Sequence, residues 1–99
     1  MTAPSRFVIN QRVRLTVLTK NSAGTLTDPT DLEIRYKDPL EAVTVKTYLL
    51  GQVIKDSTGT YHLDIDLNAI GSWHWYSKAT GSIVGANEGM FLVKESEFY

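Results

Sequence analysis

The chain has 99 residues, of which 42% are hydrophobic and 21% are charged, and its formal net charge is -1. This length provides one domain with a modest core, and the composition argues against intrinsic disorder. The sequence contains no cysteine, which excludes disulfides, thiolate metal sites and cysteine nucleophiles, and it lacks the excess of positive charge that is typical of nucleic-acid-binding domains.

An alternation of apolar and polar residues with a period of two predicts half-buried strands along most of the chain. The predicted strands, in chain order, are residues 6–9, 11–19, 32–37, 42–50, 53–54, 61–67, 72–79 and 89–94. The clearest is 61–67, where apolar side chains alternate with His62, Asp64 and Asp66. The residues that we expect to point into the core are Val13, Leu15, Val17, Leu32, Ile34, Tyr36, Tyr61, Leu63, Ile65 and Leu67. In the last strand, Phe91 and Val93 lie on one face and Met90 and Leu92 on the other.

Turn residues separate these strands, and the strands recur at intervals of about 8–12 residues. Asp38-Pro39, for example, ends the strand 32–37, because proline cannot donate a hydrogen bond to a sheet. About seven short strands with this spacing predict an all-β fold, an antiparallel β-sandwich. An up-and-down barrel is the alternative architecture.

His62, Asp64 and Asp66 share one face of a predicted strand, about 7 Å apart in successive pairs, and His74 lies on the following strand. Histidine and carboxylate ligands suit zinc or manganese, so these four residues are the most metal-like set in the chain. The competing interpretation is a solvated strand face, because ligands with this spacing converge only beside a closely matched partner strand. We therefore predict no metal and no cofactor.

Trp73 and Trp75 have the same strand parity and flank His74. One interpretation is an exposed aromatic platform that stacks on sugars or bases. The other is a sandwich core, which needs large inward-pointing aromatic side chains. The shared parity and the apolar residues of neighbouring strands favour the core for at least one of the two.

Arg12, Arg14, Arg35 and Lys37 point outward from two predicted strands. Such cations can steer the docking of a partner, although charged outer faces also serve simply to prevent edge aggregation. We take Arg12, Arg14 and Arg35 as candidate partner-binding residues. A nucleic-acid groove would need more positive charge with interleaved exposed aromatics, and the apolar runs are too short to span a membrane, so we expect neither partner.

The sequence offers no recognisable set of catalytic residues. Its only histidines, His62 and His74, are not near a Gly-x-Ser-x-Gly nucleophile elbow. Walker and Gly-x-Gly-x-x-Gly phosphate-binding motifs are also missing. We therefore predict that the protein is not an enzyme.

Several segments resemble the signature motifs of bacterial and phage immunoglobulin-like domains. Residues 56–65 resemble the D-x-x-G-x-Y motif, and residues 70–75 resemble the P-G-x-W/Y-x-Y/W strand that follows it, with isoleucine in place of the frequent proline. Residues 88–93 resemble the closing G-x-F-x-V strand. Residues 11–15 and 32–39 resemble the opening strand and the V-x-L-x-V-x-D-P strand.

This resemblance covers roughly residues 10–94 and implies an immunoglobulin-like sandwich, similar to small accessory proteins encoded among the virion genes of tailed bacteriophages. The extent of the predicted strands divides the chain into an N-terminal arm at 1–6, a sandwich at 7–94 and a C-terminal tail at 95–99. The resemblance further implies that Gly59 forms a turn and that Tyr61 buries its ring and bonds its hydroxyl to the backbone, as in a tyrosine corner.

The expected function is therefore that of a non-enzymatic structural subunit of a virion, assembled in the host cytoplasm. Many copies would dock on capsid, portal or tail subunits of a symmetric particle, with Phe98 and Tyr99 as terminal aromatic anchors. The absence of cysteine fits assembly in a reducing compartment. The alternative is a carbohydrate- or cell-surface-binding module that recognises a host glycan through Trp73, Trp75 or Tyr76.

Overall fold

The computed structural model of the chain describes residues 5–96. These residues form eight strands: β1 (Ser5–Val8), β2 (Arg12–Leu18), β3 (Asp31–Lys37), β4 (Val43–Thr47), β5 (Ile54–Ser57), β6 (Thr60–Asp66), β7 (Gly71–Thr80) and β8 (Gly85–Lys94). Within this range there is no helix long and apolar enough to cross a membrane.

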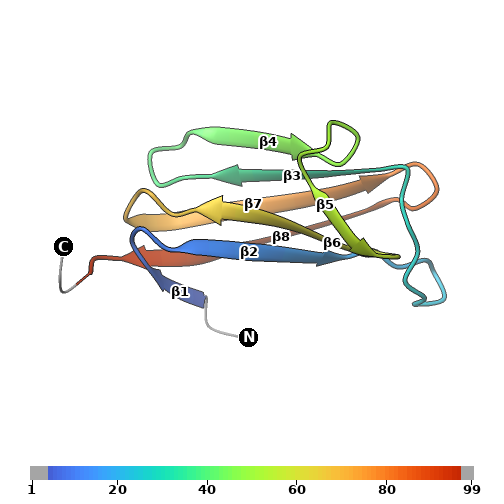
Figure 1. Cartoon of the computed structure of the whole chain (residues 1–99), viewed down its shortest axis with the longest axis horizontal. Coiled ribbons are helices and arrows are strands. Elements are labelled where there is room, and N and C mark those ends of the chain that lie inside the picture. The colour runs from blue at the N-terminus through green and yellow to red at the C-terminus, as the bar shows by residue number, and fades with distance from the viewer. Residues whose placement is uncertain (1–4, 97–99) are drawn as a thin grey trace.

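The strands form two sheets that pack against each other as a sandwich (Figure 1). The larger sheet has the order β1-β8-β7-β3-β4, and the smaller sheet has the order β2-β6-β5. All strand pairs except one are antiparallel. The structure thus confirms the all-β sandwich that the alternating pattern predicts.

The one parallel pair joins β1 to β8, with Ser5 opposite Phe91 and Val8 opposite Lys94. It arises because the chain changes sheets directly after β1 instead of forming a hairpin. The Ile9 amide donates to the Lys94 carbonyl in the larger sheet at 3.0 Å, whereas the Asn10 amide donates to the Leu67 carbonyl beside the smaller sheet at 2.8 Å. Asn10 makes this crossing with a φ of 72°, a conformation that asparagine tolerates better than most residues.

The bounds of the sandwich differ slightly from the expected division of the chain. β1 begins at Ser5, two residues before the expected start of the sandwich, and β8 ends at Lys94, which is the expected last residue. Phe7 fixes β1 to the core through an edge contact with Phe91, with 5.4 Å between the ring centroids. The first strand is therefore part of the sandwich and not of an arm.

The core lies between the sheets and follows the predicted parity closely. Trp73 is only 2% exposed and stacks on Phe91, with 6.0 Å between the ring centroids. The buried apolar residues are Leu32, Ile34, Val53, Tyr61, Leu63, Ile65, Leu67, Trp73, Ala79, Phe91 and Val93. The expected inward residues that are half-buried and pack against this core are Val13, Leu15, Val17 and Tyr36.

The two sheets are unequal, with five strands in one and three in the other. β2 lies at one end of the smaller sheet and pairs only with β6. Because none of the described strands lies on its other side, the inward side chains of β2 are half-buried, although they belong to the core face. The inner face of the larger sheet is left partly uncovered beside β2.

Asp28, in the connection between β2 and β3, ties down the turn between β5 and β6. Its Oδ1 accepts hydrogen bonds from the Gly59 amide at 2.8 Å and from the Tyr61 hydroxyl at 3.0 Å, and its Oδ2 accepts one from Lys55 Nζ at 2.6 Å. The Tyr61 ring is buried as expected, but its hydroxyl bonds a carboxylate and not the backbone. The reason is that the Thr27 amide donates to the Thr19 carbonyl, which holds the neighbouring Asp28 beside the turn.

Gly59 occupies the turn that the motif predicts, with a φ of 72°. A Cβ atom at this position would lie 2.7 Å from the Thr19 carbonyl oxygen and 2.8 Å from the Thr27 nitrogen, both backbone atoms. The turn therefore requires glycine for its conformation and for the close approach of the β2–β3 connection.

Candidate functional site

The expected docking cations on β2 are paired with acids on β6. Arg12 Nε and Nη2 donate to Asp66 at 2.5 and 3.1 Å, and the corresponding atoms of Arg14 donate to Asp64 at 3.0 and 3.4 Å. The bonds from the arginines hold the pKa values of both carboxylates below their usual range. This face of the smaller sheet therefore presents two forked ion pairs and not free positive charge.

The outward cations on β3 are paired as well. Arg35 Nε donates to Glu33 Oε2 at 2.9 Å, and Lys37 Nζ lies 3.0 Å from Glu41 Oε2. All four cations of the predicted outward set thus bind an acid of the same chain. A partner that docks through Arg12, Arg14 or Arg35 has to recognise the ion pair as a unit or break it.

The four metal-like residues do not come together. His62 is buried and its Nδ1 lies 2.7 and 2.8 Å from the two carboxylate oxygens of Asp56 on β5. Asp64 and Asp66 bind arginines, and His74 lies on β7 in the other sheet. Residues 5–96 contain no group of three or more histidines and acids placed to share a metal ion.

His62 was expected on the solvent face with Asp64 and Asp66, and this expectation is wrong. β6 is the central strand of the smaller sheet, so His62 lies between Thr16 on β2 and Ile54 on β5. These neighbours and the Asp56 carboxylate cover the imidazole ring. Alternation along one strand cannot show this, because the burial comes from the flanking strands.

The two tryptophans have different surroundings. Trp73 lies in the core and its Nε1 donates to the Ala69 carbonyl at 3.0 Å, which removes it from any exposed platform. Trp75 is half-buried and lies against Gly89 of β8, where an added Cβ would come within 2.7 Å of its ring. The prediction that at least one tryptophan belongs to the core is confirmed.

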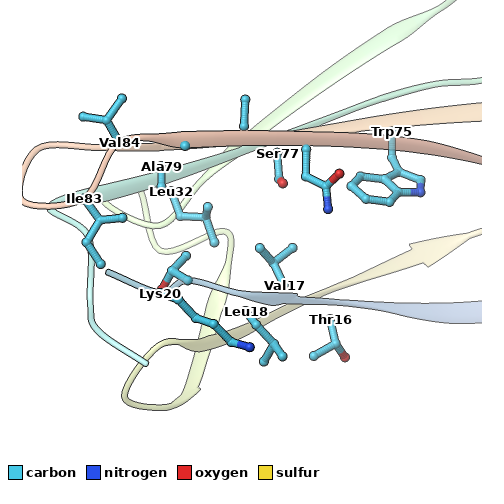
Figure 2. A pocket seen from close by; sticks show the side chains of 14 residues that line it. Thr16, Val17, Leu18, Lys20, Leu32, Trp75, Ser77, Ala79, Ile83 and Val84 are labelled. Carbon is cyan, nitrogen blue, oxygen red and sulfur yellow. The ribbon is translucent and has the colours of Figure 1, made fainter. Parts of the chain in front are cut away.

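A pocket of about 470 Å³ opens beside Trp75, between the end of β2 and the larger sheet (Figure 2). Figure 2 shows Val17 pointing up from β2 and Ser77 pointing down from the larger sheet into the same space. The apolar residues that line the pocket are Val17, Leu18, Leu32, Trp75, Ala79, Ile83, Val84 and Ala86. We call this side of the sandwich, where β2 faces β8, the β2 margin.

The opposite side of the sandwich carries exposed apolar side chains. We define the β4 margin as β4, its connection to β5, and β5. Its exposed large apolar residues are Val43, Val45, Leu49, Leu50 and Ile54, of which Leu49 is 66% and Leu50 is 74% exposed. β4 pairs only with β3, so one side of this strand has no neighbour among the described strands.

The sequence interpretation missed both margins. The segment 42–50 is rich in β-branched and aromatic residues, a composition that favours a strand but does not show whether Val43 and Val45 face a core or solvent. The consecutive pair Leu49-Leu50 after a strand was the available sign of exposed apolar surface. The candidate anchors Phe98 and Tyr99 lie outside the described residues.

Comparison with solved structures finds the same architecture at low sequence identity. The Lin-41 filamin domain has a TM-score of 0.71 and 12% identity, over 95% of this chain and 87% of that chain. A putative glycoside hydrolase from Bacteroides vulgatus ATCC 8482 has a TM-score of 0.62 and 14% identity, over 93% of this chain and 16% of that chain. No protein-family model and no curated protein matches the sequence. These likenesses establish an immunoglobulin-like β-sandwich.

Proposed function

We propose that the protein is a non-enzymatic structural subunit of a tailed-bacteriophage virion. In this role it is an immunoglobulin-like accessory domain that docks on the capsid or at a head–tail or tail joint. The sequence motifs at residues 56–65, 70–75 and 88–93 support the phage assignment by resemblance. The observation that carries the docking role is the exposed apolar surface of the β4 margin.

This surface has the properties of a protein-binding site. Leu49 and Leu50 expose a large apolar area in the connection after β4, and a partner that covers them gains hydrophobic free energy. Val43 and Val45 add apolar area on the outer face of the larger sheet, whereas Ile54 lies on the outer face of the smaller sheet, opposite His62. The unpaired side of β4 also offers main-chain hydrogen bonds to a neighbouring strand. In a symmetric particle, many copies of such a modest contact add up to stable attachment through avidity.

The charged groups of the described residues support a role without catalysis. Asp64 and Asp66 are held by arginines, and His62 is buried against Asp56. The Asp28 carboxylate accepts hydrogen bonds from Lys55, Gly59 and Tyr61, which fix the turn between β5 and β6. We infer that these groups stabilise the sandwich and leave its surfaces to binding.

Incorporation into particles tests the proposal. The double variant Leu49→Lys, Leu50→Lys should fold with an unchanged melting temperature but be lost from purified virions, as measured by quantitative mass spectrometry. Leu40→Lys is the matched control, because Leu40 is 82% exposed in the β3–β4 turn, at the other end of β4. Failure to find the unaltered chain in purified particles of the phage that encodes it would overturn the proposal.

The terminal aromatic residues provide a second test of docking. Deleting residues 95–99, which removes Phe98 and Tyr99, should reduce incorporation without unfolding the domain, because all eight strands end at or before Lys94. Normal occupancy of the shortened chain would show that the anchors are not needed. The β4 margin would then be the remaining docking surface.

A second candidate function is carbohydrate binding, with a host-surface glycan as the ligand. One observation favours it: Trp75 lines an open pocket together with the polar side chains of Ser77 and Asn87. Trp73 takes no part, because it is buried in the core. Binding on a glycan array that is lost in Trp75→Ala would support this function.

A further inference from the structure

We propose that the β2 margin is a strand-addition site, which binds an extended segment of another polypeptide with apolar residues at alternate positions. The segment would pair with the free side of β2 and insert its inward side chains into the pocket beside Trp75. This site lies on the opposite side of the sandwich from the β4 margin and goes beyond the docking surface described above. Three features support this occupant: the unpaired backbone groups of β2, the uncovered inner face of the larger sheet, and the charge of Lys20.

The unpaired backbone groups of β2 can be identified from the ends of its ladder with β6. The Leu67 amide donates to the Gln11 carbonyl at 2.9 Å, and the Thr19 amide donates to the Gly59 carbonyl at 2.8 Å. The register between these two bonds is continuous, so odd-numbered residues of β2 bond to β6 and even-numbered residues face away. Thr16 and Leu18 therefore direct their N–H and C=O groups toward the open margin.

The facing sheet has a free edge at the same place. β1 covers β8 only from Phe91 to Lys94, so residues 85–90 of β8 have no neighbour on that side among the described strands. The pocket is lined by residues from both sides of this gap, including Thr16, Leu18, Gly85 and Asn87. A fourth strand beside β2 would continue the smaller sheet over this uncovered part of the larger one.

The pocket has the size and lining that such a strand requires. Residues 16–20 border it over a length of about 14 Å, which accommodates five residues of an extended chain and places two or three alternate side chains inward. Val17, Leu32 and Ala79 offer apolar contact to these side chains. The pocket volume of about 470 Å³ lies within the range that is typical of ligand-binding pockets.

The Ser77 hydroxyl reaches the surface of the pocket and has no hydrogen-bond partner among residues 5–96. The residue as a whole is only 4% exposed. Figure 2 shows this side chain directed into the space between the sheets. An inward threonine of the added strand would give Ser77 a hydrogen-bond partner and place a methyl group against the apolar wall.

Charge at the end of the pocket further defines the partner. Lys20 lines the pocket at the end of β2 and, unlike Arg12 and Arg14, forms no ion pair with the described residues. A strand that carries an acidic residue at the end beside Lys20 would complement this charge. The partner segment is therefore an extended strand with an acidic end and alternating apolar and threonine side chains facing inward.

A defined peptide tests the inference on the full chain. The probe is acetyl-Glu-Ser-Val-Ser-Thr-Ser-Val-amide, titrated into the isotope-labelled protein and followed by amide NMR. We expect saturable binding, slowed hydrogen exchange at the Thr16 and Leu18 amides, and a shift of the Trp75 indole signal. A peptide of the same composition with its apolar residues adjacent should bind at least tenfold more weakly.

Variants separate strand pairing from other ways of filling the pocket. Thr16→Pro removes one outward amide and leaves the bonds to β6 intact, so it should weaken peptide binding at least tenfold. Thr16→Val keeps the amide and should bind within twofold of the unaltered chain. If Thr16→Pro fails to fold, the peptide N-methylated at its central residues provides the same test, because it cannot complete the ladder.

Two further measurements test the side chains. Lys20→Glu should weaken the peptide with glutamate and favour a peptide with lysine in its place, and Ser77→Ala should reduce the preference for threonine over valine. The inference is overturned if the peptide shows no saturable binding or if Thr16→Pro and N-methylation leave its affinity unchanged. A glycan that binds in a Trp75-dependent way and is unaffected by Thr16→Pro would also overturn it, in favour of a sugar site.

Discussion

The hydroxyl of Tyr61 donates a 3.0 Å hydrogen bond to Oδ1 of Asp28, and this oxygen also accepts the Gly59 amide. One carboxylate thus connects a core tyrosine, the turn before β6 and, through Oδ2, the Lys55 ammonium on β5. Burial, together with the bond to Asp28, raises the pKa of Tyr61 to about 12. The bonds from Lys55, Gly59 and Tyr61 lower the pKa of Asp28.

Removing the hydroxyl should destabilise the protein. Tyr61→Phe keeps the ring and its edge contact with Tyr48, at 5.3 Å between centroids, but leaves Asp28 without one donor. We expect a loss of about 1 kcal/mol in the free energy of unfolding, measured by urea denaturation at neutral pH. Tyr48→Phe is the control, because the Tyr48 hydroxyl bonds none of the described residues, and an equal loss in both variants would contradict the assignment.

Alkaline pH should weaken the fold through the same residue. The folded state raises the pKa of Tyr61 above the value of about 10 in the unfolded chain. The stability from its neutral hydroxyl is therefore complete below pH 10 and is lost as pH rises from about 10 to about 12. Urea unfolding across this range should show a steeper loss in the unaltered protein than in Tyr61→Phe, and parallel curves would count against the coupling.

Acid should weaken the fold through Asp28. Its folded pKa lies below that of the unfolded chain, so its contribution is present above about pH 4 and disappears as pH falls through the lowered value. Asp28→Asn should therefore be less stable than the unaltered protein at pH 7, and the gap should close toward pH 2. A gap that is constant with pH would show that the charge of Asp28 does not matter.

Gly59 should tolerate alanine much less well than Gly24. Both have positive φ values, 72° and 82°, but a Cβ at Gly24 meets no atom within 4 Å. Gly24→Ala should cost about 1 kcal/mol from backbone strain alone. Gly59→Ala should cost at least about 2 kcal/mol, because the added carbon also displaces the backbone at Thr19 and Thr27. Thermal or urea unfolding of the two variants measures the difference, and equal losses would contradict the close approach.

The fold could be predicted because it depends on information within each strand. Alternation in 61–67 placed Tyr61, Leu63 and Ile65 in the core, and the structure agrees. The turn at Gly59 could also be predicted, because the local motif places a glycine there and the turn needs the positive φ that glycine adopts easily. The burial of His62 could not be predicted from alternation, because it depends on the strands that lie beside β6.

The surfaces could not be predicted in the same way, because they depend on which strands become neighbours. Arg12 and Arg14 are free cations in the sequence and become ion pairs only through their register with Asp66 and Asp64. The pocket beside Trp75 exists because β1 pairs with β8 and leaves β2 without a second neighbour among the strands of residues 5–96. Strand order decides both features, and alternation along the chain carries no signal for it.

The parallel pairing of β1 with β8 also determines how the domain responds to mechanical force. Tension applied through the segments before Ser5 and after Lys94 pulls these two strands in opposite directions along their common axis. The bonds between them are then loaded together in shear, whereas an antiparallel terminal hairpin would open one bond at a time. A pull between these two segments is therefore carried directly by the short ladder that joins β1 to β8.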